Sequence, residues 1–156
     1  MIMEDIKNAC ALTGHRTIGD DFSEQKLKDI FIELIREQNV RTFYCGMAIG
    51  FDLIACEILC DLRAVYPDLR VVACVPCPEQ AEKFSFFNKR TYERLLNACD
   101  EKVIVSPKYD RACMHIRNRY MVDRAAFLVA YCNKTTGGSA STVRYAEKKS
   151  REIIFV

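Results

Sequence analysis

The sequence predicts an α/β fold: a three-layer, doubly wound, mainly parallel sheet of about six strands, in one domain spanning residues 1–156. Two observations support this prediction. Short apolar runs alternate along the chain with segments in which apolar residues recur at helical spacing. The apolar runs are continuous instead of alternating with polar residues, which indicates strands in a parallel sheet with helices on both faces. A length of 156 residues, with 50% hydrophobic and 28% charged residues, suits one domain.

Caps and helix breakers set the expected element boundaries. We expect strands at residues 8–12, 40–45, 70–75, 102–105, 127–131 and 153–156. We expect helices after Ser23, from the 46–52 turn to about Val65, and at about 88–99, 111–123 and 141–150. Ser23, with Glu24 behind it, has the chemistry of an N-cap. Pro67 follows the second helix, and Pro76 and Pro78 close the third strand. Residues 84–87 form a looser aromatic segment.

The helix from about Arg111 is basic. Its expected core stripe consists of Cys113, Ile116 and Tyr120, with Arg117 and Met121 at the border. Arg117 would then be partly buried, a placement that favours an anionic partner. Arg119 and Asp123 are spaced for an i,i+4 ion pair.

The overall charge and the cysteine pattern restrict the function classes. A formal charge of +2 is too small for a general polyanion binder, so nucleic acid is not an expected partner. The N-terminal residues lack a signal-peptide pattern and no apolar run is long enough to span a membrane, so we expect a cytoplasmic protein. Cys74 and Cys77 are spaced like a metal or redox pair, but no second Cys/His pair has ligand spacing. The nine cysteines are therefore expected to be free thiols, with no metal and no identified cofactor.

The loops that follow the strands carry the distinctive polar and glycine residues. In a doubly wound sheet, ligands bind at the carboxyl ends of the strands, near the point where the strand order reverses. The expected ligand-binding residues are Thr13, Gly14, His15, Arg16, Gly46, Gly50, Asp52, Gln80, Arg117, Asn118, Gly137, Gly138 and Ser139.

Several of these residues have two interpretations. The Gly137–Ser139 turn can bring backbone N–H groups to a phosphate, with Arg144 adding charge, or it is an ordinary connection with a serine N-cap. Asp52 suits a ribose hydroxyl, or it complements the helix dipole. His15 is either a proton or hydrogen-bond donor or a plain loop residue.

Together these segments resemble the YpsA-like family, within the SLOG superfamily that joins the DNA-processing protein DprA to the Lonely guy proteins. The resemblance rests on Thr13–Arg16, Gly46–Asp52, Glu79-Gln80, Arg117–Asp123 and Gly137–Ser139, in that order. It implies a Rossmann-like domain over residues 1–156 with a pocket for a nucleotide or nucleotide-derived ligand. It also implies that homo-oligomers occur among the relatives.

The Lonely guy branch suggests a sharper comparison. These enzymes cleave N-glycosidic bonds of nucleotides with an arginine in a Met-His-x-Arg-Lys helix and a glutamate in a glycine-rich turn. Residues 114–118 resemble the first motif and place Arg117 on the arginine, whereas the glutamate position falls on Arg144. Glycosidic chemistry depends on carboxylates. The resemblance therefore favours a ligand sensor or regulatory module over an enzyme.

Two other functions remain open. The first is hydrolysis of nucleotide N-glycosidic bonds, with Asp52, His15 and Arg117 as candidate catalytic residues. The second is single-stranded DNA binding, as in DprA.

Overall fold

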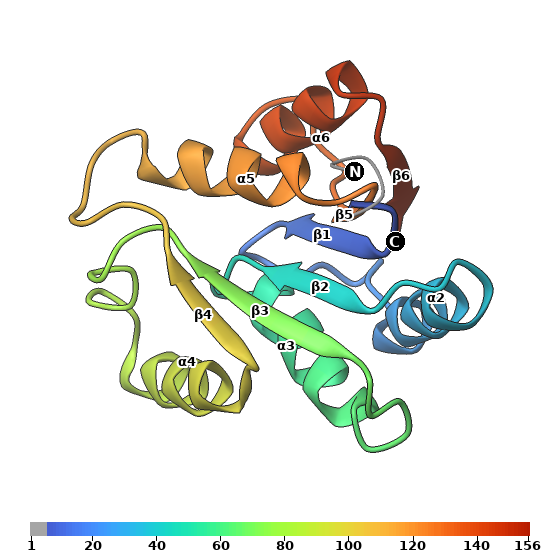
Figure 1. Ribbon diagram of the computed structural model, residues 1–156. Helices are drawn as coiled ribbons and strands as arrows, with labels where there is room; N and C mark the ends of the chain where they lie inside the picture. Colours follow the sequence, from blue (N-terminus) through green and yellow to red (C-terminus); the bar gives the residue numbers. More distant parts are fainter. Residues whose placement is uncertain (1–5) are drawn as a thin grey trace.

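The computed structural model describes residues 6–156, so the first five residues of the N-terminal segment considered above lie outside it (Figure 1). The described residues form six strands and five helices. In chain order they are β1 (Ala9–Gly14), α2 (Glu24–Glu37), β2 (Thr42–Cys45), α3 (Phe51–Leu62), β3 (Arg70–Val75), α4 (Phe86–Ala98), β4 (Glu101–Ile104), α5 (Cys113–Asp123), β5 (Phe127–Tyr131), α6 (Gly138–Lys148) and β6 (Glu152–Phe155).

The six strands form one parallel sheet in the order β4-β3-β2-β1-β5-β6. The first four strands step outward from β1 in one direction, and the chain then crosses to place β5 on the other side of β1. The strand order therefore reverses between β1 and β5, where Gly14 pairs in register with Tyr131. This confirms the predicted α/β class with a Rossmann-like sheet, and it puts the expected ligand crevice at the ends of β1 and β5.

Helices cover both faces of the sheet (Figure 1). Helices α2, α3 and α4 pack on one face, over a core that includes Leu12, Phe31 and Phe43. Helices α5 and α6 pack on the other face, over a smaller core that includes Met121 and Leu128. Three layers result because the helices that connect β1 to β4 all lie on one face of the sheet, whereas the helices that connect β4 to β6 lie on the other face.

Most elements match the expected boundaries, and the deviations have local causes. Strands 70–75 and 127–131 are as predicted, while α3 ends at Leu62, before the expected Val65. Helix α4 begins at Phe86 because the Ser85 hydroxyl accepts a hydrogen bond from the Asn88 N–H, so part of the aromatic segment is helical. β4 is not an apolar run buried on both faces, because it is an edge strand with mostly exposed residues. No helix within residues 6–156 has the length and apolarity to cross a bilayer.

The core-facing stripe predicted for α5 lies beside the row of residues that the structure buries. Ile116 is 47% exposed and Tyr120 is only partly buried, whereas the buried residues of α5 are Cys113, Arg117, Met121 and Val122. The face of α5 that meets the sheet therefore follows an i, i+4, i+8 row, and it includes Arg117 because backbone carbonyls there accept hydrogen bonds from its guanidinium. A prediction from hydrophobicity alone selects the neighbouring row, which contains Ile116 and Tyr120.

The predicted Arg119–Asp123 ion pair does not form in the part of the chain that the structure describes. The Asp123 carboxylate accepts a hydrogen bond of 2.7 Å from the Tyr145 hydroxyl of α6. The Arg119 guanidinium lies over the Tyr145 ring, 4.9 Å from its centroid. Tyr145 thus supplies a partner for each charge from a second helix.

Candidate functional site

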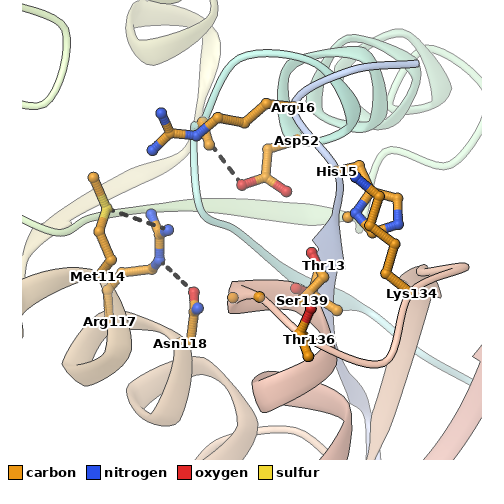
Figure 2. Close-up of a pocket in the computed structure, with 14 residues that line it drawn as sticks. Thr13, His15, Arg16, Asp52, Met114, Arg117, Asn118, Lys134, Thr136 and Ser139 are labelled. Carbon is orange, nitrogen blue, oxygen red and sulfur yellow. Dashed lines mark hydrogen bonds between the residues drawn. The ribbon is translucent and has the colours of Figure 1, made fainter. Parts of the chain in front are cut away.

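An open cavity of about 430 Å³ lies at the switch point between β1 and β5 (Figure 2). Its walls come from the loop after β1, the start of α3, the first turns of α5 and the start of α6. The lining residues are Thr13, Gly14, His15, Arg16, Ala48, Asp52, Met114, Arg117, Asn118, Lys134, Thr136, Gly137, Gly138 and Ser139. This volume is within the range of small-molecule sites.

Ten of the thirteen residues expected to bind ligand line this cavity; Gly46, Gly50 and Gln80 do not. The sequence interpretation missed four lining residues, Ala48, Met114, Lys134 and Thr136. Met114 precedes Arg117 and Asn118 by one helical turn, which places it on the same face of α5, and this spacing was the available signal. Lys134 and Thr136 belong to the loop that leads to Gly137, and only the fold shows which way this loop turns.

Gly50 allows the loop after β1 to pack against the start of α3. Its φ is +83°, and a Cβ atom there would lie 2.2 Å from the Arg16 carbonyl oxygen. The Phe51 N–H donates a hydrogen bond of 3.1 Å to the carbonyl of His15. Because Gly50 has no side chain, the loop after β1 and the turn before α3 come into contact behind the cavity.

Gly46 is the contact point of three side chains from separate elements. Its carbonyl accepts hydrogen bonds from the Arg117 guanidinium and, at 2.9 Å, from Gln80 Nε2. A Cβ atom at Gly46 would lie 2.8 Å from an Asp52 oxygen and 2.9 Å from the Arg117 guanidinium carbon. Gly46 and Gln80 are therefore positioning residues behind the cavity.

Arg117 is a buried cation held by α5. It is 4% exposed, and besides Gly46 its guanidinium donates to the Asn118 side-chain oxygen at 2.8 Å. A longer contact of 3.8 Å reaches the Met114 sulfur (Figure 2). Burial lowers the pKa of Arg117, and the nearby Asp52 carboxylate acts in the opposite direction. An arginine fixed in this way presents a preorganised guanidinium to an anion.

Asp52 is a buried carboxyl group with one unsatisfied oxygen. It is 6% exposed, and Oδ2 accepts a hydrogen bond of 3.2 Å from the Ala48 N–H. Oδ1 has no hydrogen-bond partner within residues 6–156. Burial raises the pKa of Asp52 to about 6, against the opposing effects of Arg117, the Ala48 N–H and Arg16. A buried oxygen without a partner is costly, so this group is suited to accept a hydrogen bond from a ligand hydroxyl.

His15 is oriented by its neighbours. Its Nε2 accepts a hydrogen bond of 3.0 Å from the Asn133 N–H, and its ring meets the Tyr131 ring edge-on, with centroids 5.4 Å apart. These two contacts set the orientation of the His15 ring at the wall of the cavity.

The glycine turn leaves the N-terminus of α6 open. The helix begins at Gly138, three residues before the expected start, and its N-cap Gly137 makes no side-chain hydrogen bond, so the predicted serine cap is wrong. A Cβ atom at Gly137 or Gly138 would meet no other atom within 4 Å. Arg144 is exposed, donates a hydrogen bond of 2.9 Å to the Thr135 carbonyl, and does not line the cavity. The positive end of the helix thus faces the cavity without a competing side chain.

A second cavity of about 600 Å³ adjoins the first and shares Arg16, Ala48 and Met114 with it. Gln80 lies in its wall, together with Phe84, Asn88 and Tyr109. The shared residues place the two cavities next to each other at the carboxyl edge of the sheet.

Comparison with known proteins supports the architecture. A model of the YpsA family, described as the YspA SLOG family, matches residues 21–154. The chain is 29% identical over 137 residues to the SPbeta prophage-derived protein YoqJ of Bacillus subtilis (strain 168), and the alignment covers 80% of each chain.

Two solved structures share the fold. DNA processing protein A (DprA) from Streptococcus pneumoniae superposes with a TM-score of 0.68 at 16% identity, over 99% of this chain and 51% of that one. DprA from Helicobacter pylori, which was studied for its single-stranded DNA binding mode, superposes with a TM-score of 0.67 at 20% identity, over 97% of this chain and 66% of that one. The chain thus spans about half to two thirds of these proteins.

Proposed function

The chain belongs to the YpsA (YspA SLOG) family, and on this premise we propose that it is a cytoplasmic protein that binds a nucleotide or nucleotide-derived ligand as a sensor or regulatory module. One observation carries the proposal: the open N-terminus of α6, the fixed Arg117 and the Asp52 carboxyl group, which has one buried oxygen without a partner, all belong to the wall of one cavity. These groups match a phosphate and a sugar hydroxyl on the same molecule.

The phosphate fits at the start of α6. Backbone N–H groups there are unpaired, and the helix dipole adds about half a positive charge. Arg16 and Lys134 lie at the same cavity and supply further positive charge. Side chains at Gly137 and Gly138 would fill the space that a phosphate needs.

The sugar fits beside Asp52. A carboxylate repels a phosphate but accepts hydrogen bonds from hydroxyl groups, so Asp52 separates the sugar position from the phosphate position. The adjoining cavity then accommodates the base, where the Phe84 and Tyr109 rings offer stacking surfaces. A ligand in this pose would be as long as a nucleotide.

The arrangement favours binding over catalysis. In the Lonely guy motif a glutamate assists cleavage, and here the corresponding Arg144 points to the Thr135 carbonyl outside the cavity. Ligand binding that orders the loops after β1 and β5 would be the regulatory event.

Equilibrium dialysis tests the proposal directly. The panel consists of ribonucleoside mono-, di- and triphosphates with each of the four bases, the matching nucleosides, the 2′-deoxynucleotides and inorganic phosphate. We expect at least one ribonucleotide to bind, the nucleosides to bind at least tenfold more weakly, and the deoxy analogues to be weaker than their ribose counterparts. Saturating nucleotide should also raise the melting temperature.

Two exposed arginines provide a matched control. Arg16→Met should weaken nucleotide binding at least fivefold, because Arg16 lies at the junction of the two cavities. Arg94→Met should leave binding unchanged, because Arg94 is on α4 and pairs with Glu57 at 3.1 Å. Failure of every nucleotide in the panel to bind the wild-type protein would refute the proposal.

Hydrolysis of nucleotide N-glycosidic bonds is the second candidate, and the Asp52 carboxyl favours it. A buried carboxyl with a pKa of about 6 in a ligand cavity has the properties of a general acid or base near neutral pH. Release of free base by the purified protein, abolished by Asp52→Asn with nucleotide binding retained, would move the assignment from sensor to enzyme.

The similarity to DprA concerns a third candidate ligand, which is single-stranded DNA. Because the Helicobacter pylori protein binds single-stranded DNA, the expectation that nucleic acid is not a partner has no support from the comparisons. Fluorescence anisotropy with a labelled oligothymidine separates the two cases. Binding that falls steeply with salt would favour DNA, whereas a nucleotide site predicts competition by mononucleotides.

A further inference from the structure

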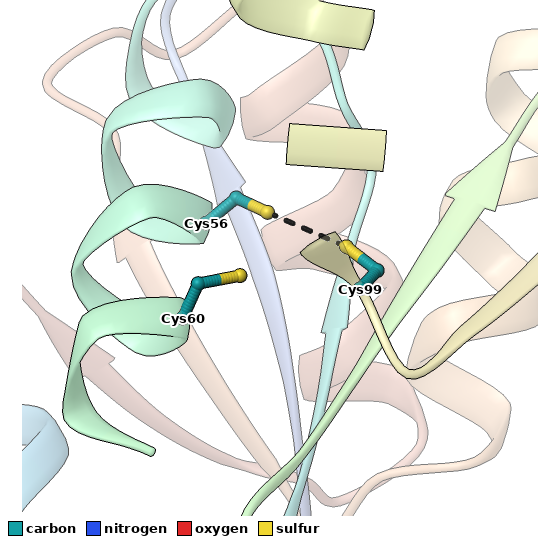
Figure 3. Close-up of side chains that lie close together, drawn as sticks. All are labelled: Cys56, Cys60 and Cys99. Carbon is teal, nitrogen blue, oxygen red and sulfur yellow. Dashed lines mark hydrogen bonds between the residues drawn. The ribbon is translucent and has the colours of Figure 1, made fainter. Parts of the chain in front are cut away.

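Three cysteines from two helices meet on the α3–α4 face of the sheet (Figure 3). Cys56 and Cys60 project from the same side of α3, one turn apart, and Cys99 follows the last residue of α4. Their three sulfur atoms all lie within 4.8 Å of one another. The Cys56 and Cys99 sulfurs are 3.7 Å apart. We refer to these residues as the cysteine cluster.

The cluster is separate from the nucleotide cavity. Asp52 faces the cavity from the first turn of α3, whereas Cys60 is in the last turn of that helix. Cys99 lies two residues before β4, at the amino end of that strand, which places the cluster toward the opposite edge of the sheet. No residue of the cluster lines the cavity.

The sulfur separations suit a thiophilic metal ion. A disulfide needs sulfurs about 2.05 Å apart, so the three cysteines are free thiols here. With Zn–S bonds of about 2.3 Å, two ligands of a tetrahedral site lie about 3.8 Å apart. The 3.7 Å separation of Cys56 and Cys99 already matches that value. The Cys60 sulfur lies within 4.8 Å of the other two, so it would have to approach them by up to about 1 Å to reach that spacing.

An ion pair lies beside the cluster. The Nε atom of the Arg63 guanidinium is 3.5 Å from the Cys60 carbonyl, and its Nη1 atom pairs with Asp100 at 2.9 Å. Three thiolates around Zn²⁺ carry a net charge of −1. Arg63 is the neighbouring cation, and it shares its charge with Asp100.

Access to the cluster is from the side of Cys60 and Cys99, which are only partly buried. Cys45 of β2 also interacts with Cys56, but it is fully buried on the core side. This leaves the partly exposed side of the cluster for an ion and a water molecule.

We propose that Cys56, Cys60 and Cys99 bind one Zn²⁺ ion through their three thiolates, with water as the fourth ligand. On binding, the protons of the thiols pass to solvent. The ion links α3 to the end of α4 and is a structural clamp independent of the nucleotide site.

Cobalt substitution provides the test. Tag-free, fully reduced protein is titrated with Co²⁺ under anaerobic conditions, and thiolate-to-cobalt charge transfer and tetrahedral ligand-field bands are followed. We expect one Co²⁺ per chain, displacement by one equivalent of Zn²⁺, and a higher melting temperature with Zn²⁺. Elemental analysis after dialysis should give one zinc per chain.

Serine variants at the partly buried positions complete the test. Cys60→Ser and Cys99→Ser should each weaken Zn²⁺ binding at least tenfold and remove most of the charge-transfer intensity. Cys132→Ser is the matched control, since Cys132 is a partly buried free thiol outside the cluster, and it should leave both unchanged. Circular dichroism confirms folding of each variant. Absence of the charge-transfer band in wild type, its persistence in both cluster variants, or its equal loss in Cys132→Ser would overturn the proposal.

Discussion

Asp52 and Arg117 approach one another across Gly46, so closely that a single added Cβ atom would contact both groups. Within residues 6–156, neither group takes part in an ion pair of 4.0 Å or less. The protein thus holds a buried acid and a buried base side by side without a direct ion pair. The Arg117 guanidinium donates its hydrogen bonds to Gly46 and Asn118 instead.

Gly46→Ala should destabilise the protein by about 1–3 kcal/mol, because the methyl group overpacks the space between Asp52 and Arg117. Gly138→Ala is the control, since a Cβ atom there meets nothing within 4 Å; its free energy of unfolding should change by less than about 1 kcal/mol. Urea denaturation measures both. Nucleotide affinity should fall in Gly138→Ala despite its normal stability, and equal stability losses in the two variants would contradict the packing.

Asp52→Asn should stabilise the protein at neutral pH. The pKa of Asp52 rises from 3.8 to about 6 on folding, so between these values the folded state holds a proton that the unfolded state has lost. Wild-type stability therefore falls as the pH rises through this window. The asparagine variant lacks this loss and should be more stable by up to about 3 kcal/mol above pH 6.

Urea unfolding across the pH range measures this difference. The advantage of Asp52→Asn should shrink as the pH falls from about 6 to about 4, and it should be absent below about 4, where the carboxyl is protonated in both states. A stability difference that does not change with pH would show that the carboxyl titrates normally in the folded protein.

Arg117→Met should raise the pKa of Asp52 further. The guanidinium is the largest opposing influence on the pKa of the buried carboxyl, and methionine retains most of the volume while it removes the charge. Carbon-13 NMR of the labelled Asp52 carboxyl follows the titration. Arg94→Met on α4 should leave the titration unchanged, and an unaltered Asp52 pKa in Arg117→Met would mean that the two groups do not interact.

Substitutions on α5 test which row of the helix faces the sheet. Ile116→Gln should change the free energy of unfolding by less than about 0.5 kcal/mol, because Ile116 is largely exposed. Met121→Ala should cost about 2–5 kcal/mol, because Met121 is 1% exposed. Thermal and urea unfolding measure both. A larger loss of stability in Ile116→Gln than in Met121→Ala would mean that the row predicted from hydrophobicity faces the sheet.

Local patterns were sufficient to predict the fold and most of the cavity. Strands 70–75 and 127–131 match because apolar runs bounded by prolines or polar residues have one reasonable assignment. Thr13 at the end of β1, His15 just after it and the turn at Gly137 were predicted to lie together because parallel strands bring their carboxyl ends, and the loops that follow them, to one edge.

Contacts between elements that are distant in sequence were not predicted. Arg117 is buried because the carbonyls of Gly46 and Cys74 receive its guanidinium, and neither is near it in sequence. Gln80 supports Gly46 from behind, and Asp123 bonds to Tyr145 and not to Arg119. Each of these hydrogen bonds joins separate elements, and local sequence patterns do not reveal such bonds.

The succession of strands and helices along the chain, the parallel sheet and the loops that carry the polar residues could all be predicted from the sequence. They depend on periodicity, caps and breakers along the chain. The tertiary structure alone decided that Asp52 keeps one oxygen free, that α6 opens without a cap, and that Cys99 meets Cys56 and Cys60. Desolvation, hydrogen-bond satisfaction and metal coordination depend on atoms that are close in space, and the chain brings those atoms together from positions tens of residues apart.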